Sequence, residues 1–247
     1  MASPHSDCYM RCMDISLALS LFSPWDISVL VLLLAAWLGI GWRIEHPSDR
    51  APSVSVLMAE FRREWMTQMI TRQPRIYDAT ILGGLRQGTA FFASATMIST
   101  GGVLALMGNT ESLMEVAGDL AQVRDPAIVL EVKLLVILFF ITNAFLKFVW
   151  SNRLFGYCAV LMSAVPNDMD DPLTHLRARQ AAEINVTAAR GFNRGLRSVY
   201  FALAAVAWLV GPLALGAATV LTCLVLWRRE FASQSRDVLL MRDAHTP

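Results

Sequence analysis

The sequence predicts an all-α integral membrane helical bundle, with four transmembrane helices and helical extensions on the cytoplasmic side. Hydrophobic side chains make up 55% of the 247 residues and charged ones only 17%, whereas a soluble globular chain carries about 25% charged residues. The mean hydropathy is +0.47, and four segments approach the roughly 20 apolar residues that a crossing needs. With a net charge of +1 and four cysteines, this composition excludes a disordered chain, a basic nucleic-acid-binding domain and a disulfide-rich secreted scaffold.

The first expected span covers residues 25–42 and has a tryptophan at each end. Aromatic residues in such flanking positions are typical of the two membrane–water interfaces. We expect residues 1–14 to form a disordered tail and the short apolar stretch 15–22 to lie at the interface. The membrane domain is then expected to extend over residues 15–235, and residues 236–247 form a second tail.

The second and third expected spans cover residues 88–108 and 128–150. The second is uncharged and rich in glycine, serine and threonine. The third follows Asp125-Pro126, which favours a helix start because aspartate caps the first turn and proline fits its first position. The helical pattern continues to about residue 165, so we expect this helix to extend beyond the bilayer.

The fourth expected span, residues 198–227, is a charge-free run with a helical length of about 45 Å. One perpendicular crossing needs less than that. Gly211-Pro212 lies near the middle of the run, which predicts a single kinked or tilted helix. Two half-length crossings fit less well, because each half is short for a bilayer.

Lysine and arginine are retained on the cytoplasmic side of a membrane and therefore indicate orientation. They concentrate in the connections 43–87 and 151–197, whereas the N-terminal tail and the connection 109–127 contain one each. With four spans, this asymmetry predicts both termini outside and both arginine-rich connections in the cytoplasm. The basic C-terminal tail, which contains four arginines, opposes this orientation.

Two helices are expected in the arginine-rich connections. Apolar residues at helical spacing over residues 53–73 predict an amphipathic helix that ends at Pro74; it packs on the bundle or lies on the inner leaflet. A second, alanine-rich helix is expected to begin at Asp171-Pro172. The neighbouring Asp168 and Asp170 would also fit a divalent cation. A turn and a helix cap explain them more simply, so no metal site is predicted.

Three arginines form a basic stripe at the cytoplasmic mouth of the fourth span. Arg190, Arg194 and Arg197 recur at helical spacing and share one face. Such a stripe is typical of a cytoplasmic anchor. It also fits binding of anionic lipid headgroups, which attract each arginine by about 1 kcal/mol, or of the acidic surface of a partner protein.

Polar side chains inside the spans are the best hint of function. Thr96 and Thr100 share a face of the second span, and Asn143 and Lys147 share a face of the third. Hydroxyls and small residues help helices to pack in lipid, and Lys147 is close enough to the helix end to reach the interface. The alternative to these structural roles is a polar pathway through the membrane, lined by these four residues. Another face of the second span carries small residues: Gly84, Gly88, Ala95, Ser99 and Gly102.

Sequence motifs for nucleophilic catalysis, phosphate-binding loops, haem or iron–sulfur ligation do not occur in the chain. The sequence therefore favours a protein that is not an enzyme, and it predicts no cofactor. Cys158 and Cys223 lack metal-binding spacing and are expected to be free structural thiols.

Several short stretches match the pattern of one family. They include Arg63-Glu64-Trp65-Met66, Arg75-Ile76-Tyr77-Asp78-Ala79, Glu131-Val132-Lys133, Phe192-Asn193-Arg194-Gly195-Leu196-Arg197 and Arg228-Arg229-Glu230-Phe231. In these stretches the chain resembles bacterial members of the domain of unknown function 599 family of multi-pass membrane proteins, over about residues 17–235. The resemblance implies several membrane helices. It implies no activity, so no catalytic residue is carried over.

Two functions are therefore expected as alternatives. The first is an oligomeric channel or transporter-like conduit in which Thr96, Thr100, Asn143 and Lys147 face a polar pathway. The second is a membrane scaffold or assembly protein, in which the amphipathic helix and the stripe at residues 190–197 bind anionic lipid or a partner complex. The expected partners are membrane lipids with anionic headgroups and further copies of the chain, but not nucleic acid.

Overall fold

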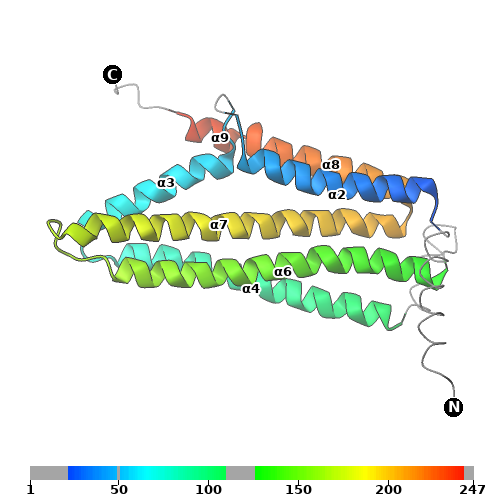
Figure 1. Ribbon diagram of the computed structural model, residues 1–247, viewed down its shortest axis with the longest axis horizontal. Helices are drawn as coiled ribbons and strands as arrows, with labels where there is room; N and C mark the ends of the chain where they lie inside the picture. Colours follow the sequence, from blue (N-terminus) through cyan, green and yellow to red (C-terminus); the bar gives the residue numbers. More distant parts are fainter. Residues whose placement is uncertain (1–21, 49–50, 110–125, 242–247) are drawn as a thin grey trace, which may run out of the picture.

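The computed structural model describes residues 22–48, 51–109 and 126–241, and all regular structure in these ranges is helical (Figure 1). This confirms the predicted all-α fold. In chain order the helices are α2 (Pro24–Glu45), α3 (Val54–Gln68), η1 (Met69–Thr71), α4 (Ile76–Met107), α6 (Ala127–Ser163), α7 (Pro172–Val206), η2 (Ala207–Leu209), α8 (Pro212–Phe231) and α9 (Gln234–Leu239).

Capping residues in the sequence set several helix starts. The Ser23 hydroxyl accepts from the Asp26 N–H at the start of α2, and the Asp26 side chain accepts from the Ser23 N–H in return. At the start of α3, the Ser53 hydroxyl accepts from the Val56 N–H. The Asp171 carboxylate accepts from the backbone of Leu173, with proline at the first position of α7. The predicted start of the alanine-rich helix is therefore confirmed.

The three longest helices lie side by side along the molecule (Figure 1). α6 packs along α7 on one side and along α4 on the other. α2 and α8 lie together against the second half of α7, while α3 lies against its first half (Figure 1). Four segments are long and apolar enough to cross a membrane: Pro24–Glu45, Ile76–Met107, Ala127–Ser163 and Pro212–Leu239. The structure thus supports an integral membrane bundle with four such helices.

The prediction of one kinked helix over residues 198–227 is wrong. α7 ends at Val206, a 3-10 turn follows, and the chain reverses at Gly211 before α8 begins at Pro212 (Figure 1). Gly211 has φ 149°, a value that L side chains rarely adopt, so glycine suits this reversal. The prediction failed because residues 198–206 are too few to form a crossing helix alone. In the structure they are the apolar end of α7, which begins at Pro172.

The reversal changes where the chain ends lie. α8 runs parallel to α2: Gly216 near its start lies against Val29, and Arg43 near the end of α2 lies 5.0 Å from the Phe231 ring centre. The start of α2 and the end of α8 are therefore at opposite ends of the bundle (Figure 1). The expectation of both termini outside depended on a single crossing at 198–227 and loses its basis.

Two hydrophobic clusters divide the bundle along its length. On α7 the first cluster ends at Ala188 and the second begins at Phe201. Arg194 and Arg197 lie between these two points. The first cluster includes Met66, Met69, Leu82, Phe155, Cys158 and Ala181. The second includes Leu33, Phe140, Trp208 and Leu215.

The remaining fold predictions have mixed outcomes. The amphipathic helix is confirmed as α3, which packs on the chain's own α7. The extended third span is confirmed as α6, which continues to Ser163. The segment expected to be a tail from residue 236 instead contains part of α9, held by a hydrogen bond from Arg236 Nε to the Pro52 carbonyl at 2.9 Å. The predicted N-terminal tail at 1–14 lies outside the described residues.

Candidate functional site at the arginine-rich end of the spans

A cleft of about 370 Å³ opens where α2, α6 and α7 meet. Its wall combines aromatic and cationic side chains from three helices. They are Trp37, Leu38, Gly41, Trp42, Glu45 and His46 of α2 or its end, Asn143 and Lys147 of α6, and Arg194, Arg197 and Ser198 of α7. We call this the boundary cleft. It joins two sets of residues that the sequence placed in separate hypotheses, the polar face of the third span and the arginine stripe.

A three-residue ion cluster forms one side of the boundary cleft. Arg194 donates to Glu45 Oε1 through Nε at 2.8 Å and to Glu45 Oε2 through Nη2, and Arg197 Nη2 also donates to Glu45 Oε1. The Arg197 side chain is only 8% exposed, whereas that of Arg194 is 45% exposed. A buried guanidinium requires a partner charge, so Glu45 is needed to hold Arg197. One carboxylate thus serves two arginines and leaves a positive charge in excess.

Lys147 adds a second excess charge. Its side chain is half-buried in the boundary cleft and makes no hydrogen bond or ion pair with the described residues. Trp42 and His46, from α2 and its end, line the same cleft and stack with ring centres 5.3 Å apart. The cleft therefore presents cations beside flat, apolar ring surfaces.

Close helix packing produces this arrangement. Arg194 and Arg197 are three residues apart and share a face of α7. A Cβ at Gly195, between them, would lie 2.7 Å from the Phe148 ring, so only glycine allows α7 to lie this close to α6 here. On α2, Gly41 leaves room for the Arg197 side chain, whose Nε would be 3.8 Å from a Cβ there.

The third arginine of the predicted stripe, Arg190, lies elsewhere. It lines a second pocket of about 510 Å³ between α3, α7 and α8, which shares Glu45 and Arg197 with the boundary cleft. In this pocket Glu230 accepts from the Ser55 N–H and hydroxyl, both at 3.0 Å, and so ties α8 to the start of α3. The structure therefore brings Arg194 and Arg197 to Lys147, but not Arg190.

Thr96 and Thr100 are not part of the boundary cleft. The Thr96 hydroxyl donates to Phe92 O at 2.8 Å, and the Thr100 hydroxyl donates to Thr96 O at 2.9 Å, so both bond to their own helix. Thr96 is buried while Gly88, Ser99 and Gly102 on the small-residue face are exposed. The four residues proposed to line one polar pathway are thus not brought together in the single chain.

Polar contacts also fix the α3 region against α7. Arg63 Nε donates to Glu183 at 2.6 Å, and this bond lowers the pKa of the Glu183 carboxyl below its ordinary value. Asp78 is fully buried and accepts from Trp65 Nε1 at 2.6 Å and from Arg72. The first pair joins α3 to α7, the second group joins α4 to α3, and none of these residues lines the boundary cleft.

The turn at Asp168–Asp171 and the two described cysteines lie outside the boundary cleft. The Asp168 carboxylate accepts from the Asp170 N–H at 3.0 Å, as in a turn. In the part of the chain that the structure describes, histidine, cysteine, aspartate and glutamate form no group of three or more suited to a metal ion. Cys158 and Cys223 are free thiols, as the sequence predicted.

Sequence reasoning missed Glu45. It is an acidic residue at the end of an apolar span, next to the most arginine-rich connections. Its position could have indicated an ion pair, because a carboxylate near several arginines at a membrane boundary is expected to pair with them. The partner helix was not predictable from α2 alone.

The comparison with known families is consistent with this architecture. The family model described as "Protein of unknown function, DUF599" matches residues 28–235. The chain belongs to this family. The match covers both arginine-rich connections and every residue of the boundary cleft. Neither the curated proteins nor the solved structures contain a significant match to the chain.

Proposed function

We propose that this DUF599 protein binds the headgroup of an anionic phospholipid in the boundary cleft. The observation that carries the proposal is Lys147, which has no hydrogen-bond or ion-pair partner among the described residues. It lies beside Arg194 and Arg197, which share the single carboxylate of Glu45. A phosphodiester would supply the acceptor oxygens that these donors lack, and guanidinium and ammonium groups both bind phosphate well. The cleft walls at Trp37 and Leu38 would lie along an acyl chain.

The position of the boundary cleft along the spans supports a lipid as its ligand. Exposed tryptophans lie near the level of the cleft on three helices: Trp42 near the end of α2, Trp150 three residues beyond Lys147 on α6, and Trp227 near the end of α8. Tryptophans gather at headgroup level. At the other end of α2, Trp25 is also exposed, and the distance along the helix from Trp25 to Trp42 is about 26 Å, close to a hydrocarbon core. The cleft would therefore lie at the headgroup region of one leaflet.

We further propose an orientation in a bacterial inner membrane that differs from the sequence expectation. If the tip of α7 also enters the bilayer beside α2 and α8, the chain crosses five times and its ends lie on opposite sides. The connections 43–87 and 151–197 and the basic segment after α8 would then all lie on the cytoplasmic side. This assignment removes the conflict that the arginines near the C-terminus posed.

The orientation is tested by cysteine accessibility in cells. A chain without Cys158 and Cys223 retains Cys8 and Cys12 before the first span, and a second chain without any native cysteine carries Ser235→Cys. An impermeant maleimide should label the first chain in intact spheroplasts and the second only after permeabilisation. Labelling of Ser235→Cys in intact spheroplasts would contradict the five-crossing orientation.

Lipid binding is tested by native mass spectrometry of the full chain in mild detergent. Phosphatidylglycerol is titrated against phosphatidylethanolamine with matched acyl chains, and anionic lipid should bind more tightly. Lys147→Met should weaken phosphatidylglycerol binding about fivefold, because one interfacial cation contributes about 1 kcal/mol. Lys147→Arg keeps the charge and should retain binding, and Arg179→Gln, an exposed arginine outside the cleft, is the control. Equal binding of both lipids would refute the proposal.

The other functions expected from sequence have less support. A conduit through one chain is disfavoured by the separation of Thr96 and Thr100 from Asn143 and Lys147. A conduit between several copies, and a scaffold that holds a partner complex, both remain predictions. Flux through reconstituted vesicles tests the conduit: unchanged flux of ions and small solutes in Thr96→Leu with Lys147→Met would exclude it.

A further inference from the structure

The boundary cleft changes from polar to apolar along α6, from its charged end toward the middle of the span. Lys147 and Asn143 line the cleft about one helical turn apart. One turn further along, the Phe139 and Phe140 rings pack edge-on against Trp37 of α2, with ring centres 5.8 and 5.3 Å away. Trp37 also lines the cleft. A cation, an amide and a group of aromatic rings thus follow one another at successive turns.

The spacing of these groups matches the depth of the headgroup layer. The hydrocarbon core is about 30 Å thick and the whole bilayer about 40–45 Å, so the polar layer of each leaflet is about 5–8 Å deep. Asn143 is four residues from Lys147, which is about 6 Å along the helix. When Lys147 contacts the phosphate of a bound lipid, Asn143 therefore lies at the top of the hydrocarbon. The ester linkages of a glycerophospholipid occupy that level.

The Asn143 amide has no partner within the part of the chain that the structure describes. Its side chain is half-buried in the cleft and makes no hydrogen bond with the described residues. Ser198, which lines the same cleft, differs because its hydroxyl donates to Arg194 O at 3.3 Å on its own helix. Lipid chains offer no hydrogen bonds, so an unpaired polar group is costly at membrane depth. The amide therefore needs an acceptor from a bound molecule.

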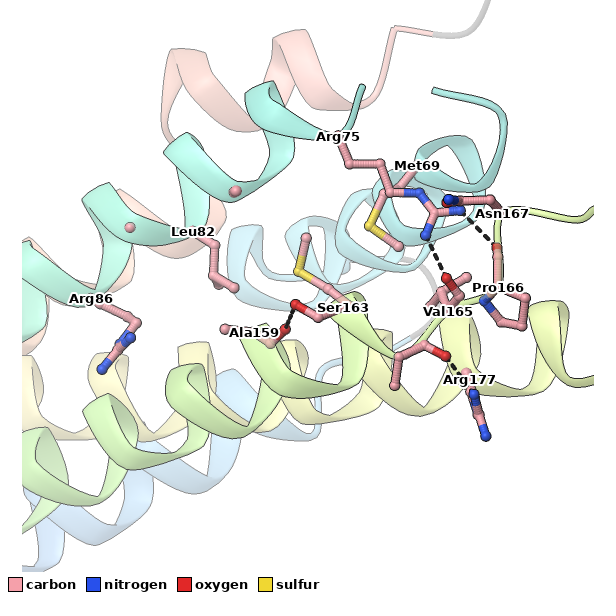
Figure 2. Close-up of a pocket in the computed structure, with 14 residues that line it drawn as sticks. Met69, Arg75, Leu82, Arg86, Ala159, Ser163, Val165, Pro166, Asn167 and Arg177 are labelled. Carbon is pink, nitrogen blue, oxygen red and sulfur yellow. Dashed lines mark hydrogen bonds between the residues drawn. The ribbon is translucent and has the colours of Figure 1, made fainter. Parts of the chain in front are cut away.

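A further cavity, of about 520 Å³ among the ends of α4, α6 and α7, shows the contrasting case (Figure 2). Arg75, Arg86 and Arg177 line it. Arg75 Nη1 donates to Val165 O at 2.7 Å, and Arg177 Nη1 donates to Ala164 O at 2.6 Å. These bonds satisfy carbonyls at the C-terminal end of α6. Arg75 and Arg177 thus act on the chain itself, whereas the Asn143 amide is left for a ligand.

An ester carbonyl of a glycerophospholipid is the acceptor that fits this position. The side-chain NH₂ of Asn143 is a donor, and the carbonyls of a diacyl lipid are acceptors at this depth. Lipids whose chains are joined by ether bonds lack these carbonyls. The cleft walls that follow, Trp37 and Leu38, are apolar and suit acyl chains. A hydrogen bond from Asn143 would therefore distinguish lipids by linkage rather than by headgroup charge.

We propose that the Asn143 amide donates to an ester carbonyl of the bound lipid, so that the boundary cleft selects ester-linked diacyl glycerophospholipids. The inference rests on the proposed binding of anionic phospholipid in this cleft. In this arrangement the phosphate lies at Lys147, the glycerol beside Asn143 and the acyl chains along Trp37 and Leu38. Asn143 is then a residue that determines specificity, separate from the cations that attract the headgroup.

The test is native mass spectrometry of the full chain in mild detergent with two phosphatidylglycerols. One carries ester-linked oleoyl chains and the other ether-linked oleyl chains of the same length. The unaltered chain should bind the ester lipid about fivefold more tightly, the effect of one neutral hydrogen bond. Asn143→Leu should weaken binding of the ester lipid by the same factor and leave the ether lipid unchanged. Thr142→Val is the matched control, because Thr142 is the adjacent residue and does not line the cleft.

The outcomes separate this inference from the proposed function. Equal binding of ester and ether phosphatidylglycerol to the unaltered chain would overturn the role of Asn143, even where phosphatidylglycerol still binds more tightly than phosphatidylethanolamine. An ester preference that persists in Asn143→Leu would also overturn it. Equal binding of phosphatidylglycerol and phosphatidylethanolamine would refute the proposed function and this inference together. Retained binding of the ether lipid to Asn143→Leu shows that the cleft is intact, and the comparison on the unaltered chain needs no variant.

Discussion

Gly195 lies where α7 approaches Phe148 on α6 too closely for a larger side chain. In Gly195→Ala the new Cβ would lie 2.7–3.0 Å from three atoms of the Phe148 ring. That ring is fully buried and packs against Phe92 and Phe192, each with ring centres 5.4 Å away, so it has little room to move. Overpacking costs about 1–3 kcal/mol, and against a ring that cannot move we expect the upper part of that range, about 2–3 kcal/mol. Alanine recovers about 1 kcal/mol of this through its helix propensity. We expect a net loss of about 1–2 kcal/mol.

The measurement is thermal unfolding of the purified chain in detergent, followed by intrinsic fluorescence. A loss of that size should lower Tm by about 2–8 °C in a chain of this length. Gly191→Ala is the matched control on the same helix, because its Cβ would make only an ordinary 3.5 Å contact with Ser151. Phe148→Leu should relieve part of the cost of Gly195→Ala, so the two changes should be non-additive. A Gly195→Ala chain at least as stable as Gly191→Ala would refute the close-packing argument.

Three further predictions concern groups away from the clefts. Asp78→Ala removes a fully buried acceptor and leaves Trp65 Nε1 unpaired. This change should lower the free energy of unfolding by about 1.5–3 kcal/mol in the same assay. The control is Glu64→Ala on the exposed face, which should change that free energy by no more than about 0.5 kcal/mol. Cys158, with 0% exposure, should react with N-ethylmaleimide only after denaturation when it is the single cysteine left; rapid labelling of the folded chain would contradict its burial. Arg63 lowers the pKa of Glu183, so this pair stabilises the fold above the ordinary carboxyl pKa of 4.5 and loses its effect as the pH falls below it. Both side chains are about half exposed, so Glu183→Gln should cost at most about 1 kcal/mol at neutral pH, and a larger loss would contradict a surface pair.

Much of the fold was predictable because membrane helices follow from local composition. Long apolar runs, Ser23 and Asp171 as caps, and the apolar spacing of α3 each act within a few residues. The reversal at Gly211 was not predictable in the same way. Gly-Pro inside an apolar run fits both a kink and a turn. Which one forms depends on whether residues 198–206 belong to a helix that starts far upstream.

The candidate site was predictable only in part for a related reason. The face of Asn143 and Lys147 and the stripe of Arg194 and Arg197 were each visible as helical spacing on one helix. Their meeting in one cleft depends on how α2, α6 and α7 pack, which no single helix encodes. Arg75 and Arg86 were counted only as charges for orientation. Their cavity arises from small residues on two facing helices, such as Gly83 and Ala159.

Photo-crosslinking tests the central claim, anionic lipid in the boundary cleft, most directly. The full chain is reconstituted with phosphatidylglycerol that carries a diazirine in its headgroup, irradiated, and mapped by peptide mass spectrometry. We expect adducts on the cleft residues Trp42, His46 and Ser198, and their loss in Lys147→Met but not in Lys147→Arg. Adducts spread evenly over the exposed faces of α4 and α8, or unchanged in Lys147→Met, would contradict the account.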